Sequence, residues 1–123
     1  MQWNDTEFAG FSTKKPWIKV NENYKYLNVA SLEKDPNSLL NNYKKLISLR
    51  NSEPVLQYGK YNQLSFSNDL ISFTREYNGE TIKGFFNFSE NPKEISLKAN
   101  EKILVGKTVI EPNNFLVVKQ ETF

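Results

Sequence analysis

The clearest periodic pattern in the chain lies in residues 36–51, where apolar side chains recur at the spacing of one helix face. Asp35 precedes the pattern as an N-cap, and Pro36 fits the first turn, where a missing N–H costs nothing. Pro54 ends the element, because the residue before a proline disfavours helical geometry. The apolar positions are Leu39, Leu40, Tyr43, Leu46 and Ile47. We therefore predict one amphipathic helix at 36–51.

From Val55 onward the pattern changes to a period of two, which predicts strands. YNQLSF, EISLK, KILVGKTVI and FLVVKQ are typical of short strands. Asn78-Gly79 separates two alternating runs and predicts a hairpin, because both turn positions require positive φ. Gly106 interrupts another run and predicts a turn or bulge. Strands at this spacing predict a small antiparallel sandwich or barrel. We expect its core to contain Phe73, Phe85, Phe86, Phe88 and Phe115.

Residues 1–34 are rich in aromatic side chains but show neither the helical nor the strand spacing of apolar residues. Trp3, Phe8, Phe11 and Trp17 all precede residue 18. Unstructured segments longer than about 12–15 residues are usually functional loops or linkers, and the aromatic content argues against a linker. The predicted order is thus an irregular loop, one helix and an all-β unit, with a boundary near residues 52–57.

Composition narrows the possible partners. The 123 residues suffice for one domain, or for one small domain and part of another. The sequence has 16 Lys and Arg residues and 14 Asp and Glu residues, so its positive charge is small, and arginine occurs only as Arg50 and Arg75. We therefore expect no nucleic-acid partner. No apolar run approaches the ~18 residues of a membrane span. No signal peptide is visible, and we expect a cytoplasmic protein.

The absence of cysteine and histidine restricts the chemistry further. It excludes disulfides, thiolate chemistry and every Ser-His or Cys-His arrangement. The acidic residues are scattered and match no calcium loop, and the glycines form no phosphate loop. We therefore expect no metal and no cofactor.

The opening segment holds two kinds of candidate sugar contact. Asp5 and Glu7 could supply a carboxylate pair for glycoside hydrolysis, but carboxylates so close in a loop are usually solvated. Aromatic side chains could stack on sugar rings, or could simply pack in a core or interface. Trp17 and Tyr24 are the stacking candidates that we select from a larger set: Trp3, Trp17, Tyr24, Tyr26, Tyr58 and Tyr61. The residues by themselves indicate a structural or binding module.

Five motifs follow one another in the first thirty residues: MQWND at 1–5, AGFST at 9–13, PW at 16–17, VNENY at 20–24 and LNV at 27–29. They resemble the segment after the last barrel strand in bacterial α-glucosidases of glycoside hydrolase family 13. In the branch of oligo-1,6-glucosidases, dextran glucosidases and trehalose-6-phosphate hydrolases, that segment reads R-T-P-M-Q-W-D-D, A-G-F-T-T, P-W, V-N-P-N-Y and I-N-V. Asn4 and Glu22 depart from this pattern.

The rest of the chain continues the resemblance, most weakly after about residue 90. The matching positions are D-P-x-S at 35–38, Y-x-K-L-I at 43–47, L-R at 49–50, Y-G at 58–59, F-x-R at 73–75 and N-F at 87–88. The resemblance implies that residues 1–54 end a catalytic (β/α)8 barrel and that 55–123 form a C-terminal antiparallel β-sandwich. The expected fold is therefore mainly β, preceded by an irregular loop and one helix left over from the barrel. Met1 falls inside the R-T-P-M-Q-W motif, so we expect further sequence upstream.

The resemblance also implies a function, namely retaining hydrolysis of α-glucosidic bonds in oligosaccharides by an Asp nucleophile and a Glu acid/base. Both residues would lie upstream, so we assign no catalytic residue and expect this chain alone to be non-catalytic. Gln2 and Trp3 would lie nearest the active site, as loop scaffold. The linkage cleaved depends on upstream loops.

Two further expectations concern association. The helix stripe would be uncovered without the barrel, which predicts self-association or disorder in residues 1–30. The alternative function is a stand-alone carbohydrate-binding or interaction β-module, which sugar binding by exposed aromatic residues would support.

Overall fold

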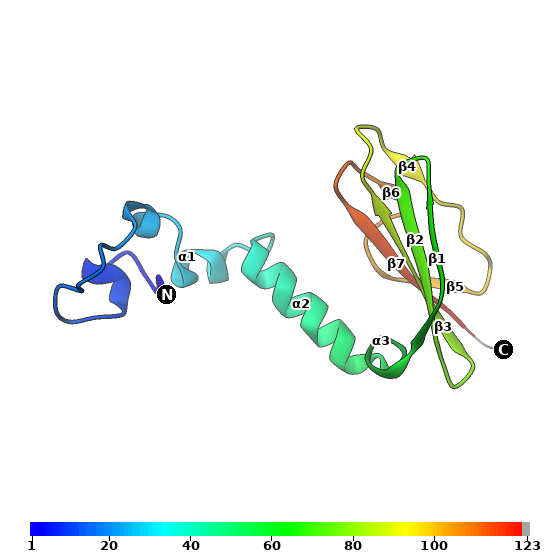
Figure 1. Cartoon of the computed structure of the whole chain (residues 1–123), viewed down its shortest axis with the longest axis horizontal. Coiled ribbons are helices and arrows are strands. Elements are labelled where there is room, and N and C mark those ends of the chain that lie inside the picture. Colours follow the sequence, from blue (N-terminus) through cyan, green and yellow to red (C-terminus); the bar gives the residue numbers. More distant parts are fainter. Residues whose placement is uncertain (122–123) are drawn as a thin grey trace. The chain divides into compact units, whose positions relative to one another are not determined.

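The structure is a computed structural model that describes residues 1–121 as two compact units, one of Met1–Ser48 and one from Leu49 onward (Figure 1). The division falls within the longest helix. The first elements are the 3₁₀ turns η1 (Glu7–Gly10) and η2 (Glu22–Lys25) and the helices α1 (Val29–Lys34), α2 (Leu39–Ser52) and α3 (Pro54–Tyr58). The strands are β1 (Lys60–Ser67), β2 (Leu70–Tyr77), β3 (Glu80–Asn87), β4 (Lys93–Glu94), β5 (Glu101–Val105), β6 (Val109–Ile110) and β7 (Phe115–Gln120).

The predicted helix is present, but it begins at Leu39 instead of residue 36. Ser38 caps it, because the Ser38 hydroxyl accepts a hydrogen bond from the Asn41 N–H at 3.2 Å. Asp35 caps the preceding turn, where its carboxylate accepts from the Asn37 N–H at 2.9 Å. The prediction was wrong about the cap because both residues are good N-caps, three positions apart.

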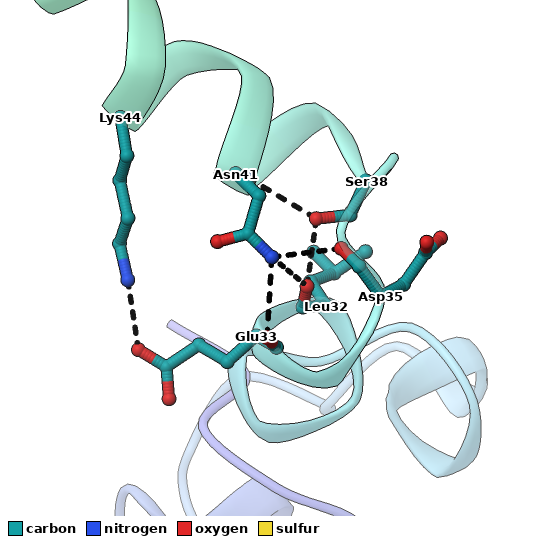
Figure 2. A network of polar contacts seen from close by, with 6 residues as sticks. All are labelled: Leu32, Glu33, Asp35, Ser38, Asn41 and Lys44. Atoms are coloured by element: carbon teal, nitrogen blue, oxygen red, sulfur yellow. Dashed lines mark hydrogen bonds and ion pairs between the residues drawn. The ribbon is translucent and has the colours of Figure 1, made fainter.

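Figure 2 shows how the start of α2 is attached to the end of α1. The Asn41 side-chain amide donates to the carbonyl oxygens of Leu32, Glu33 and Asp35 at 3.0, 3.1 and 2.7 Å. The Ser38 hydroxyl donates to the Leu32 oxygen at 2.6 Å. These bonds satisfy carbonyl groups that the end of a helix leaves without partners.

The prediction of a single helix was incomplete. α1 begins with a capping box, in which Asn28 accepts from the Ser31 N–H at 2.9 Å and Ser31 accepts from the Asn28 N–H at 3.2 Å. α3 has Pro54 at its start. Both helices are too short to display a full apolar period, which is why the pattern did not reveal them.

The second unit is antiparallel throughout its described strands. A five-stranded sheet has the order β1-β2-β3-β7-β5, and β4 pairs with β6. The Asn78-Gly79 hairpin is confirmed, with φ of 50° and 82°. Gly106, with φ of 94°, separates β5 from β6 as predicted. A second tight turn, Asn68-Asp69, joins β1 to β2 with φ of 50° and 58°.

The core lies on both faces of the five-stranded sheet. On the face that α3 covers, here called the α3 face, Val55 packs against Ile82 and Val117. On the other face, Ile110 of β6 packs against Leu116 and Val118. The expected core position of Phe88 is wrong, since β3 ends at Asn87 and Phe88 is 59% exposed. The other four predicted phenylalanines are half-buried.

One ion pair couples the stability of this unit to pH. Lys83 binds the carboxylate of Glu101, and their side chains are 21% and 5% exposed. Burial raises the pKa of Glu101. The opposing effects are larger in sum and hold that pKa below its ordinary value of 4.5: the hydrogen bond from Lys83, the hydrogen bond from the Lys98 N–H, and the charges of both lysines. The charged form is therefore favoured in the folded state.

Because the pKa of Glu101 is lower in the folded chain than in the unfolded chain, its stabilising effect is present above the unfolded pKa and is lost as the pH falls through the folded pKa. We expect Glu101→Gln to cost about 2 kcal/mol at neutral pH and to flatten the decline in stability at acidic pH. Urea unfolding at several pH values measures both effects. An unchanged acid dependence in Glu101→Gln would contradict this prediction.

Candidate functional site

The backbone of Gln2 and Trp3 is held from two sides. The Trp3 N–H donates to the Ala9 oxygen at 2.9 Å. The oxygens of Gln2 and Trp3 accept from the N–H groups of Val29 and Ala30, each at 2.9 Å, at the start of α1. The Gln2 side-chain amide also donates to the Leu27 oxygen. Both predicted scaffold residues therefore belong to one hydrogen-bonded framework.

This framework contains a strained turn. Phe8, Ala9 and Gly10 have consecutive φ values of 54°, 56° and 70°, a left-handed conformation that costs free energy in residues with a Cβ. A Cβ on Gly10 would lie 2.5 Å from the Asn4 side-chain oxygen. That oxygen accepts from the Thr6 N–H and hydroxyl at 3.1 and 2.6 Å. Since Asn4 acts here as an acceptor, it performs a role that an aspartate could also perform.

Gly10→Ala is expected to weaken this framework, because it adds a Cβ both to a left-handed residue and against Asn4. We expect amide exchange at Trp3 and Ala9 to accelerate about tenfold or more, corresponding to about 1.4 kcal/mol of lost local stability. Gly79→Ala is the matched control, since Gly79 also has positive φ but has nothing within 4 Å of an added Cβ. Equal losses at the two turns would contradict a specific effect of Asn4.

Trp17, which is 95% exposed, lines two depressions. The larger, of about 610 Å³, is lined by Phe8, Lys15, Pro16, Trp17, Lys19, Val20, Glu22, Tyr24 and Lys25. The smaller, of about 340 Å³, includes Gln2 and Trp17. The structure thus brings Trp17 and Tyr24 together, and Gln2 and Trp17 together. Trp3 does not line either depression.

Charge around the larger depression is predominantly positive, with three lysines and one carboxylate. Lys19 and Glu22 form an exposed ion pair at 2.7 Å. The side-chain hydrogen bond and the charge of Glu22 raise the pKa of Lys19, and Lys19 lowers the pKa of Glu22 in the same way. Solvent and salt screen such an exposed pair, so it contributes little to stability.

The depressions are better suited to binding than to bond cleavage. An exposed indole beside polar groups offers a stacking surface for a ring. A retaining glycosidase needs two carboxylates, whereas Glu22 is the single carboxylate among the residues lining the larger depression. Asp5 and Glu7 are exposed and line neither depression.

Two features bear on other partners. Within residues 1–121, no three or more His, Cys, Asp or Glu side chains are grouped to hold a metal ion. The helices of the same range are too short or too polar to cross a bilayer.

Comparison with known proteins gives matches that extend over most of the chain. Residues 1–59 match the family described as alpha amylase, catalytic domain. The oligo-1,6-glucosidase of Parageobacillus thermoglucosidasius is 39% identical over 118 residues, which cover 90% of this chain and 21% of that protein. The oligo-1,6-glucosidase of Halalkalibacterium halodurans is 42% identical over 89 residues, which cover 72% of this chain and 16% of that protein.

Solved structures agree with these sequence matches. The isomaltulose synthase of Protaminobacter rubrum superposes with a TM-score of 0.78 at 31% identity, covering 98% of this chain and 25% of that one. The trehalulose synthase of Pseudomonas mesoacidophila has a TM-score of 0.79 at 32% identity, covering 98% and 24%. The chain spans only 16–21% of the length of the two oligo-1,6-glucosidases.

Proposed function

Because the chain belongs to the alpha-amylase family, we propose that it is the C-terminal part of an α-glucosidase that hydrolyses α-glucosidic bonds in oligosaccharides with retention. The observation that carries this proposal is the match of residues 1–59 to the catalytic domain, together with 39–42% identity to two oligo-1,6-glucosidases. The whole enzyme would act on an oligosaccharide in the cytoplasm.

Within that enzyme, residues 1–54 would end the (β/α)8 barrel and 55–123 would form the C-terminal β-sandwich. The active site of such a barrel is built from the loops after its strands. Gln2 and Trp3 would lie in one of these loops, held by the Ala9 and α1 hydrogen bonds. The nucleophilic Asp and the acid/base Glu would lie upstream, so this chain would support the site without reacting.

A chimera tests the proposal. This chain would replace the matching segment of the Parageobacillus thermoglucosidasius enzyme, and hydrolysis of p-nitrophenyl α-glucoside would be measured. We expect the chimera to be active, and both the isolated chain and the enzyme truncated before the segment to be inactive. A chimera no more active than the truncated enzyme would refute the proposal. Turnover by the isolated chain that survives repurification would refute its non-catalytic role.

The exposure of Trp17 supports one alternative, a stand-alone carbohydrate-binding module. In that case the isolated chain would bind maltose or isomaltose, with a change in tryptophan fluorescence. Trp17→Ala would abolish binding, while Trp3→Ala would preserve it, since Trp3 lines neither depression. Absence of binding at millimolar sugar would exclude this alternative.

Association of the isolated chain is part of the proposal. Leu39, Tyr43 and Ile47 on α2 are more than half exposed, and Leu46 is half-buried. Self-association through this stripe, or disorder of residues 1–30, stays a prediction. Sedimentation velocity and amide exchange of the isolated chain would test the two.

A further inference from the structure

Two successive hairpins of the five-stranded sheet end in turns of the same length. Asn68-Asp69 joins β1 to β2, and Asn78-Gly79 joins β2 to β3. The φ values are 50° and 58° in the first turn and 50° and 82° in the second. All four residues are exposed. The two turns therefore present an asparagine at the same φ, followed by a different residue in each.

An asparagine side chain can react with the backbone nitrogen of the residue that follows it. That nitrogen attacks the side-chain carbonyl carbon and forms a new C–N bond. The bond from this carbon to the side-chain amide nitrogen breaks, and ammonia leaves with the proton that the backbone N–H gives up. Water then opens the resulting cyclic imide at one of its two carbonyl carbons, which gives aspartate or isoaspartate. The reaction thus needs water alone as a co-reactant, in keeping with the thermal lability of asparagine.

Glycine at position 79 leaves this attack unobstructed. Gly79 has no Cβ, and a Cβ built there would have nothing within 4 Å. The residues that pair across this turn are Tyr77 and Glu80, so the Gly79 nitrogen lies outside the strand ladder. At the other turn, the side chain of Asp69 stands beside the nitrogen that would have to attack. Of the two turn asparagines, Asn78 is therefore the one that can react more freely.

Hydrogen bonds hold several other asparagine amides away from this reaction. The Asn28 amide donates to the Tyr24 oxygen at 2.8 Å. The Asn41 amide donates to three carbonyl oxygens at the end of α1. The Asn87 amide donates to the Ile110 oxygen at 2.8 Å. A side chain held in this way cannot turn freely toward the backbone nitrogen that follows it.

We propose that Asn78 is a site of spontaneous deamidation in the folded chain, which proceeds by opening of the turn while the strands stay paired. Isoaspartate carries the main chain through the former side-chain carbon and so lengthens the turn. Because loop length fixes the register of a hairpin, this product loosens the pairing of Tyr77 with Glu80. Aspartate keeps the turn, since it also tolerates positive φ, but it adds a negative charge near Glu80, which binds Lys119 at 3.0 Å.

Peptide mapping of the folded chain tests the proposal. The chain is incubated at mildly alkaline pH, which favours loss of the backbone N–H proton, and is then cleaved with trypsin. Cleavage after Arg75 and Lys83 releases residues 76–83, in which Asn78 is the one asparagine. Mass spectrometry measures the conversion of the amide to an acid, and an isoaspartyl methyltransferase labels the isoaspartate. We expect Asn78 to convert at least about tenfold faster than Asn68, a barrier difference of about 1.4 kcal/mol.

Exchange of the second turn residue gives two matched variants. Gly79→Asp gives the β2–β3 turn the sequence of the β1–β2 turn, which this chain already folds with positive φ at Asp69. Asp69→Gly makes the reciprocal change. We expect Gly79→Asp to slow conversion at Asn78 about tenfold, and Asp69→Gly to accelerate conversion at Asn68 by a similar factor. Far-UV circular dichroism checks that each variant folds.

Three results would overturn the proposal. Equal conversion at Asn78 and Asn68 in the unsubstituted chain would show that Gly79 marks no site. Unchanged rates in the two exchanged variants would show the same. Conversion at Asn78 that is about a thousandfold or more slower than in concentrated urea would mean that the reaction requires global unfolding. Isoaspartate that forms at Asn78 in the folded chain and is lost in Gly79→Asp would support the proposal.

Discussion

Asn87→Ala is expected to lower the unfolding free energy of the second unit by about 3 kcal/mol. Asn87 is 1% exposed, and its side chain uses both of its polar atoms. The amide donates to the oxygens of Asn91 and Ile110 at 2.9 and 2.8 Å. The side-chain oxygen accepts from the Ser89 N–H and hydroxyl at 2.9 and 2.7 Å. Truncation removes these hydrogen bonds and leaves the oxygen of the buried Ile110 without the Asn87 donor.

Two variants distinguish the loss of this hydrogen-bond network from a simple loss of side-chain volume. Asn87→Asp retains the acceptor but places an oxygen against the two carbonyl oxygens, so we expect a loss at least as large as that of alanine. Ser89→Ala removes the hydroxyl alone and should cost about 1 kcal/mol. Urea unfolding followed by far-UV circular dichroism of the strands measures all three. A loss below about 1 kcal/mol for Asn87→Ala would contradict the prediction.

Arg75→Ala is expected to cost a similar amount, about 3 kcal/mol, and to release α3 from the sheet. The guanidinium donates to Leu56 O at 2.7 Å and to Gly59 O at 2.6 and 3.1 Å, and it lies 4.9 Å from the Tyr61 ring centroid. Three donors on two carbonyl groups require the planar fork of arginine. Arg75→Lys should therefore recover less than half of the loss.

Arg50 provides the matched control for this prediction. Its guanidinium donates to the same Leu56 oxygen at 2.7 Å. Arg50 is exposed, however, and this is the one hydrogen bond that its guanidinium makes among the described residues. Arg50→Ala should cost less than about 1 kcal/mol. Amide exchange at the Gly59 N–H, which donates to Val55 O at 3.0 Å, would report the loosening of α3 directly. Equal effects of the two arginines would contradict the assigned role of Arg75.

Local rules predicted the parts of the fold that depend on near neighbours. The Asn78-Gly79 turn and the alternation of β2 and β3 were predictable, because turn geometry and side-chain period are properties of adjacent residues. The order β1-β2-β3-β7-β5 was not, since it depends on which distant strands share a core. The burial of Asn87 likewise depends on Ile110, which no sequence pattern connects to it.

The structural support of the candidate site could not be predicted from the sequence. Trp17 and Tyr24 were selected as sugar-stacking candidates; both line one depression, and sugar binding by them stays a prediction. The left-handed turn at Phe8–Gly10 was missed, because a phenylalanine and an alanine with positive φ contradict local preference. The hydrogen bonds from the Trp3 and Asn4 N–H groups to the Ala9 oxygen help to hold that conformation, and they join residues that are separated in the sequence.

The edge strand β1 has a consequence for how this chain can be produced. All of its residues are exposed, several are apolar, and its outer backbone groups have no strand neighbour in the described sheet. Such an edge is a template for pairing with another molecule, and the bulge between Tyr61 and Gln63 interrupts it only near one end. We therefore expect aggregation of the isolated chain to begin at β1.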